Sequence, residues 1–127
     1  MRKALYHGKN CWAAFLACSL ELEYTSVAHC STENDDWKEQ TDKLLASLRL
    51  CFSEADPVSG ANLPEGFLVG AHTNGKNLPH IVIARVKHFA GIHGYEMVHD
   101  PSGNYRAGQP GAIISPTKIV IFLRFDK

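Results

Sequence analysis

The sequence carries no excess of charge of either sign, since 13 lysine and arginine residues balance 13 aspartate and glutamate residues. Nucleic-acid surfaces and polybasic membrane anchors both depend on a cationic excess. The balance therefore argues against both classes of partner, and we predict no nucleic-acid ligand and no membrane association. Internal repeats and low-complexity segments are also missing from the sequence.

Long hydrophobic runs are absent as well. No segment approaches the roughly 20 apolar residues that a membrane-spanning helix needs. The short apolar run Trp12–Leu20 follows the basic residues Arg2 and Lys3 and so imitates a signal peptide. However, no small-x-small cleavage pattern follows it, and Glu21 comes at once. We expect this run to be the first helix of the core.

Close-paired metal ligands are a third absence. The cysteines and histidines that invite a zinc interpretation show no spacing such as Cys-x-x-Cys; they are His7, Cys11, Cys18, His29 and Cys30. We therefore predict no metal and no cofactor.

The four cysteines leave two possibilities open. In a secreted protein they could form two disulfides. Cys18 and Cys51 instead fall on the apolar faces of predicted helices, which suits reduced thiols packed as small hydrophobic side chains. We favour a reducing compartment and hence a cytoplasmic location.

A chain of 127 residues, 45% of them hydrophobic, is long enough for a single domain over residues 1–127 and too short for two. Helices are expected first, one starting at Cys11 and one running from Asp35 or Asp36 to Cys51, with a surface loop over residues 53–66. Strands are expected afterward, at residues 67–72, 80–86, 95–99 and 118–125. This order indicates an α+β fold in which the N-terminal helix, carrying Cys11, packs on an antiparallel sheet.

Cys11 has the position of an activated thiol. Asn10 is a good N-cap, so Cys11 lies in the first helical turn, where unpaired N–H groups and the helix dipole stabilise a thiolate. The backbone N–H of Cys11 would also be available to a developing oxyanion.

His80 and Asp100 are candidate partners for this thiol. Each lies ten residues from Ala90 on a predicted hairpin, so symmetric pairing would bring the imidazole opposite the carboxylate. The imidazole would then act as general base and acid, and the carboxylate would fix its tautomer. Taken one at a time, these residues are better explained as a buried helix cysteine, a strand start after Pro79 and a turn, whereas their joint order and placement favour the triad.

These segments resemble the papain-like cysteine peptidases, and most closely the small bacterial and phage branch related to bacteriocin-processing peptidase domains. The resemblance rests on Asn10-Cys11-Trp12-Ala13-Ala14-Phe15-Leu16-Ala17, Leu20-Glu21-Leu22, Pro79-His80-Ile81-Val82-Ile83 and Val98-His99-Asp100-Pro101-Ser102. It covers residues 8–104 and implies a papain-like fold, with Cys11 as nucleophile, His80 as general base and acid, and Asp100 as orienting residue. It also implies a bacterial cell, or the host cell of a phage, as the setting.

One departure concerns the oxyanion hole. The family usually has a glutamine a few residues before the cysteine, and none occurs over residues 5–10. His7, Lys9 or Asn10 could supply the missing donor, and Trp12 could form a wall of the cleft. Losing one such donor typically costs about 100- to 1000-fold in rate.

The expected function is cleavage of a peptide or isopeptide bond in a peptide or protein substrate, through a thioester on Cys11. Two alternatives stay open: a catalytically weak or inactive fold that binds a peptide or protein, and a transferase or deamidase that resolves the same thioester differently. His72 could line the cleft, whereas His99 should face away from Asp100 because neighbouring strand residues point to opposite faces. Tyr105, Arg106 and Gln109 are possible cleft contacts.

Overall fold

The computed structural model describes residues 1–7, 9–74, 79–103 and 109–124. Helices come first: α1 (Cys11–Leu20), α2 (Tyr24–Val27), a 3-10 turn (Ala28–Cys30) and α3 (Trp37–Ser47). Strands follow, with a second 3-10 turn between the first two: β1 (Leu50–Ala55), Pro57–Asn62, β2 (Leu68–Asn74), β3 (Pro79–Phe89), β4 (Ile92–His99), β5 (Ile113–Ile114) and β6 (Lys118–Arg124). Of the possible cleft contacts in the late loop, Tyr105 and Arg106 lie outside the described residues.

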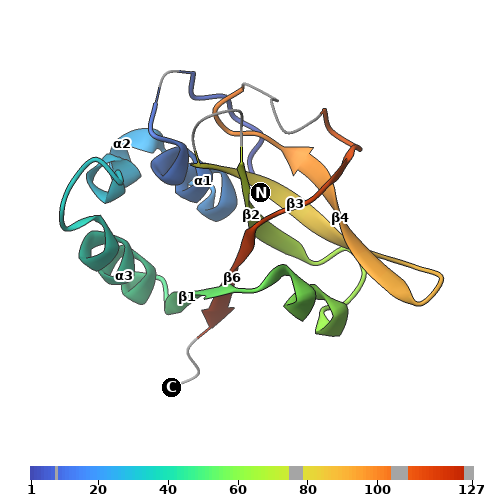
Figure 1. Cartoon of the computed structure of the whole chain (residues 1–127). Coiled ribbons are helices and arrows are strands. Elements are labelled where there is room, and N and C mark those ends of the chain that lie inside the picture. Colours follow the sequence, from blue (N-terminus) through green and yellow to red (C-terminus); the bar gives the residue numbers. More distant parts are fainter. Residues whose placement is uncertain (8, 75–78, 104–108, 125–127) are drawn as a thin grey trace.

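The strands form a six-stranded sheet in the order β1-β6-β2-β3-β4-β5, with every neighbouring pair antiparallel. The three helices gather on one side of this sheet, and α1 lies across β3 (Figure 1). The predicted α+β architecture, with the cysteine-bearing N-terminal helix packed on an antiparallel sheet, is therefore confirmed.

Two apolar clusters hold the layers together, one on each face of the sheet. The cluster under the helices joins Phe15 and Leu16 of α1 to Ile81 and Ile83 of β3. Residues 12–18 of α1 are all buried, which explains why their sequence is apolar at every position. The opposite face carries a second cluster built on side chains of the same strands: Val69, Ala71, Val82, Ala84, Val86, Tyr95, Met97, Ile114 and Ile119.

The region after α3 corrects one prediction. Cys51 was expected on a helix and residues 53–66 in a loop, but Leu50–Ala55 forms strand β1, and part of the remainder is the 3-10 turn. The strand exists because it pairs with β6, with Cys51 opposite Leu123. A strand at the edge of a sheet has one partner strand, and the partner of β1 is β6, about 70 residues later in the sequence. The residues near β1 in sequence therefore did not indicate that it forms a strand.

The β3–β4 hairpin corrects a second prediction. Pairing symmetric about Ala90 would set Phe89 opposite Gly91, but Phe89 pairs with Ile92, and the turn is made by Ala90 and Gly91, both with positive φ. The register then shifts at a β-bulge, so that Ala84 pairs with Met97 and Ile83 pairs with His99. His80 and Asp100 are therefore not directly opposite one another.

A buried hydrogen bond ties α3 to α1. The indole N–H of Trp12 donates to the Thr41 hydroxyl at 3.0 Å, and that hydroxyl donates to the Trp37 carbonyl at 2.8 Å. Thr41 is fully buried and Trp12 nearly so. The pair fixes the position of the tryptophan that follows Cys11.

Replacing Thr41 by valine should lower the free energy of unfolding by about 1–3 kcal/mol, because the indole N–H of Trp12 loses its partner in a buried site. Urea unfolding followed by tryptophan fluorescence measures the change. Thr41→Ser keeps the hydroxyl and should lose less, although it also removes a buried methyl group. Equal losses in the two variants would assign the effect to packing instead of the hydrogen bond.

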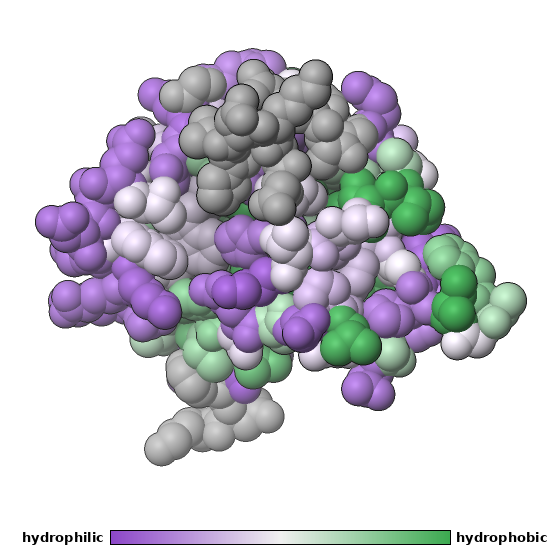
Figure 2. Space-filling model, in the orientation of Figure 1, coloured by the Kyte–Doolittle hydropathy of each residue, from purple (hydrophilic) through white to green (hydrophobic). Residues whose placement is uncertain are grey.

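The surface in the orientation of Figure 1 is largely hydrophilic over the helices, and its apolar residues form separate patches (Figure 2). The exposed apolar side chains include Phe89 and Ile92 near the tip of the β3–β4 hairpin. None of the helices in the described part of the chain has the length and apolar character that crossing a bilayer requires.

Candidate active site

Cys11 is the first residue of α1, and Asn10 caps the helix. The Asn10 side-chain oxygen accepts hydrogen bonds from the backbone N–H groups of Trp12 at 3.1 Å and Ala13 at 3.2 Å. The cap therefore satisfies two of the N–H groups at the helix start, as an asparagine N-cap does. The thiol stands at the positive end of the helix dipole, where a negative charge is stabilised.

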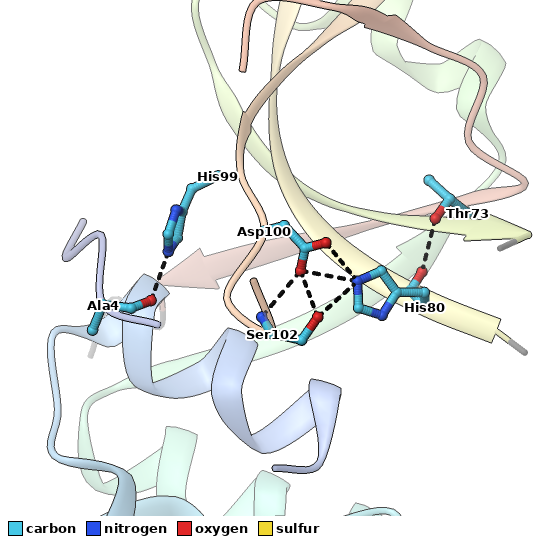
Figure 3. Close-up of polar contacts among 6 residues, drawn as sticks. All are labelled: Ala4, Thr73, His80, His99, Asp100 and Ser102. Carbon is cyan, nitrogen blue, oxygen red and sulfur yellow. Dashed lines mark hydrogen bonds and ion pairs between the residues drawn. The ribbon is translucent and has the colours of Figure 1, made fainter. Parts of the chain in front are cut away.

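His80 and Asp100 form a close ion pair behind this helix end. Nε2 of His80 lies 2.9 Å from each carboxylate oxygen of Asp100. The Asp100 side chain is 0% exposed, whereas the His80 side chain is 15% exposed. The two side chains point toward one another from the start of β3 and from just beyond β4 (Figure 3).

The two side chains meet although the hairpin is not symmetric. The paired residues of β3 and β4 end at Ile83 and His99, just past the β-bulge at Val98. Asp100 follows the last paired residue of β4, and its side chain points toward His80 (Figure 3).

The Cys11 sulfur is the third member of the group. The His80 side chain, the backbone of Ile81 and the backbone N–H of Cys11 itself all lie close enough to the sulfur to lower the pKa of the thiol. Partial burial raises the pKa of the thiol, but these three interactions and the positive charge of His80 outweigh burial, so the pKa of Cys11 is lowered. The surroundings of Cys11 favour a thiolate.

The pKa of His80 moves in the complementary direction, to about 9. The hydrogen bond with Asp100 is the largest cause, followed by the hydrogen bond with Cys11, and burial opposes both. Since Nε2 is held by Asp100, Nδ1 is the ring nitrogen left to face the sulfur. His80 is therefore protonated at neutral pH, and its positive charge favours the thiolate form of Cys11.

The other cysteines provide an internal contrast. All four thiols are free, and Cys18 and Cys30 are buried. Burial raises the pKa of both buried thiols, against weaker opposing hydrogen bonds with the Ala4 backbone and with Thr41. Cys11 thus differs from the buried cysteines in its partners as well as its position.

A cleft of about 430 Å³ opens beside the sulfur. The residues that line it are the proposed reactive side chains, two tryptophans and several polar residues: Cys11, Trp12, Thr32, Trp37, Glu54, His72, His80 and Ile81. Burial lowers the pKa of His72, and nearby Lys118 acts in the same direction while Glu54 opposes it, so this imidazole is neutral at neutral pH. Trp12 and His72, which we expected at the substrate cleft, both line this cavity.

The three residues proposed as substitute oxyanion donors are not among the residues that line the cleft. The Asn10 amide N–H donates to the Thr32 hydroxyl at 2.8 Å. The Lys9 ammonium lies over the ring of Tyr24, 5.6 Å from its centroid. His7 is exposed, and its ring packs against Gly103.

The sequence analysis did not identify two further residues of the site. Ser102 donates a hydrogen bond from its hydroxyl to Asp100, and the backbone of Ile81 lowers the pKa of the Cys11 thiol. The motif Asp100-Pro101-Ser102 is a typical sequence for a side-chain-capped turn, and that pattern was the available signal for Ser102. His99, as predicted, faces away from the site, and its ring hydrogen-bonds with the Ala4 carbonyl at 2.7 Å.

Comparison of the chain with protein-family models, with curated proteins and with solved structures finds no match. Within residues 1–7, 9–74, 79–103 and 109–124, no three or more His, Cys, Asp and Glu side chains are grouped so that they could hold a metal ion.

Proposed function

We propose that this chain is a papain-like cysteine hydrolase that cleaves a peptide or isopeptide bond through Cys11, with His80 as general acid and base and Asp100 as orienting acid. The observation that carries the proposal is the position of His80 between the other two side chains. Its Nε2 is bound by the buried carboxylate, and its ring lowers the pKa of the Cys11 thiol beside it. Nucleophilic catalysis by cysteine needs this combination.

The reaction follows from the proton positions. The Cys11 thiolate attacks the carbonyl carbon, forming a C–S bond while the carbonyl π electrons move to oxygen. The C–N bond then breaks, His80 gives its proton to the leaving amine, and a thioester remains. A water molecule attacks the thioester, gives its proton to His80 and releases the Cys11 thiolate and a carboxylic acid. The Cys11 backbone N–H lies beside the sulfur and is the donor available to the oxyanion.

The cleft supports a peptide-like substrate. Its volume of about 430 Å³ falls in the range of small-ligand sites, and the rings of Trp12 and Trp37 supply an apolar wall. The carboxylate of Glu54 and the neutral imidazole of His72 lie along the same lining. An extended segment with an apolar side chain near the scissile carbonyl fits these surroundings.

Iodoacetamide alkylation across pH 4–9, with each cysteine mapped by mass spectrometry, tests the proposal. Cys11 should react selectively below pH 7, because its pKa is lowered while the pKa values of the buried Cys18 and Cys30 are raised. Peptide hydrolysis, in contrast, should decline above pH about 9, where His80 loses the proton that the leaving amine needs. Alkylation of all cysteines only at alkaline pH would contradict the proposal.

A second candidate function is favoured by the placement of the three proposed oxyanion donors. Because Asn10, Lys9 and His7 do not line the cleft, the backbone N–H of Cys11 is the one that remains of the oxyanion donors we predicted. A site with fewer donors is slow, so a peptide- or protein-binding role on the same fold is the alternative. A transferase or deamidase would use the same acylation step and differ in the acceptor.

A further inference from the structure

Ser102 is held rigidly beside the His80–Asp100 pair. It is 5% exposed and follows Pro101 in a turn closed by a hydrogen bond from the Gly103 N–H to the Asp100 carbonyl at 2.9 Å. The Pro101 carbonyl also accepts from the Tyr6 N–H at 2.7 Å, which ties the turn to the N-terminal segment. The serine hydroxyl therefore has a fixed location.

The hydroxyl contacts both members of the pair. Its oxygen lies 2.8 Å from Asp100 Oδ1, and the Ser102 backbone N–H lies 3.0 Å from the same carboxylate oxygen. The hydroxyl oxygen is also 3.2 Å from Nε2 of His80. Figure 3 shows the three groups converging on one another.

Proton counting assigns a direction to each contact. A hydroxyl has one hydrogen to donate, and the carboxylate, which has none, accepts it. A lone pair of the hydroxyl oxygen then remains for Nε2 of His80, which faces two carboxylate oxygens and this hydroxyl. Every group around Nε2 thus accepts a hydrogen bond, so the arrangement holds a proton on Nε2 and leaves Nδ1 for the thiol.

We infer that Ser102 is a positioning residue of the active site, which orients the Asp100 carboxylate and, with it, fixes the proton on Nε2 of His80. This inference rests on the proposed cysteine chemistry. It adds a fourth side chain, one that touches neither the sulfur nor the cleft and acts through Asp100.

The electrostatics of Asp100 agree with this role. Burial raises the pKa of the carboxyl, but the hydrogen bond and the charge of His80, and then the two hydrogen bonds from Ser102, outweigh burial, and the pKa is lowered. Without the hydroxyl, the carboxylate should take up a proton at higher pH. A protonated carboxyl no longer fixes the His80 ring toward the sulfur, so the Cys11 thiolate should then regain its proton at a higher pH than in wild type.

The test is the pH profile of Cys11 alkylation in Ser102→Ala and Ser102→Thr. In Ser102→Ala the fall of the alkylation rate on the acid side of the profile should begin at a higher pH than in wild type. The alkylation rate should then be about 10-fold below that of wild type at pH 5 and within about twofold of it at pH 8. Ser102→Thr keeps the hydroxyl and should recover most of the rate at pH 5. Ser47→Ala, which removes an exposed serine hydroxyl bonded to the Leu44 carbonyl, is the matched control and should leave the profile unchanged.

Three results would overturn the inference. The first is a wild-type profile in Ser102→Ala, and the second is an equal slowing at every pH, which a loosened fold alone produces. The third needs no variant: in wild type, the Nε2 proton of His80 should show a nuclear Overhauser contact to the Ser102 β-protons, and its absence overturns the inference even if Ser102→Ala fails to fold. Failure of the proposed function can be told apart from failure of this inference. If the proposed function is wrong, Cys11 of the wild-type protein will not react selectively below pH 7.

Discussion

His80→Ala should slow alkylation of Cys11 at pH 6 by about 10- to 100-fold. The interactions of the thiol with His80, through a hydrogen bond and through charge, are prominent among those that lower its pKa against the effect of burial. Without them the thiol returns toward the pKa of a free cysteine, near 8.5, and less than about 1% of it is thiolate at pH 6. Thiolates of low pKa are intrinsically weaker nucleophiles, so the fall in rate is smaller than the fall in thiolate fraction.

The control for this variant is His29→Ala, which removes an exposed imidazole that does not line the cleft. Its alkylation profile should match that of wild type. At pH 10, where an unassisted thiol is also largely ionised, His80→Ala and wild type should react at similar rates. A persistent difference at pH 10 would mean that the substitution blocks access to the sulfur, and no difference at pH 6 would contradict the pairing of Cys11 with His80.

Cys11→Ala should abolish turnover, reducing peptide hydrolysis by about 1000-fold or more, because His80 and Asp100 are left without a nucleophile. Screening a fluorogenic peptide library with wild type first identifies a cleaved sequence, and the variant is then assayed on that sequence. Mass spectrometry of acid-quenched wild-type reactions should detect the acyl group on Cys11. The variant should show no such adduct.

The same variant distinguishes the candidate functions. Cys11→Ala leaves the walls of the cleft formed by Trp12 and Trp37 in place, so a cleaved peptide should still bind to it. If wild type binds peptides without turnover, and the variant binds them equally well, the protein is a binding module. If wild type forms the acyl adduct but releases it faster with an added amine than with water alone, the enzyme is a transferase. Unchanged hydrolysis in the variant would exclude Cys11 as nucleophile.

Local patterns were sufficient to predict the cysteine-bearing helix and the hairpin strands. The N-cap at Asn10 and the apolar residues that follow it determine where α1 starts and which element it becomes. The β-branched residues of β3 likewise determine a strand wherever its neighbours lie. Contacts within a few residues dominate in both elements, so the sequence was informative there.

The remaining features depend on partners distant in sequence. Strand β1 was missed because its pairing with β6 joins the middle of the chain to its end. The register of the hairpin was wrong because the turn at Ala90 and Gly91 and the bulge at Val98 each shift the pairing. His80 and Asp100 were selected from symmetric pairing and from the family resemblance, whereas in the structure they meet beyond the last paired residues of the hairpin, Ile83 and His99.

Ser102 illustrates a different limit. Serine after Asp-Pro is ordinary turn chemistry, and nothing in the sequence tells which acceptor its hydroxyl will find. The acceptor is Asp100, and the hydroxyl oxygen also lies 3.2 Å from Nε2 of His80, a residue 22 positions earlier in the chain. Substitute donors for the oxyanion were equally hard to choose, since Asn10, Lys9 and His7 find their contacts in neighbouring loops and helices.

The tip of the β3–β4 hairpin offers a practical route to studying this protein. Ala90 and Gly91 lie at the end of an arm that extends away from α1 (Figure 1), and the bulge at Val98 lies between this arm and Asp100. An epitope or a fluorophore-bearing peptide inserted between the two turn residues lengthens the arm outward and leaves the pairing inside the bulge as it is. Such a tagged chain could be immobilised or tracked, with its reactive end facing away from the support.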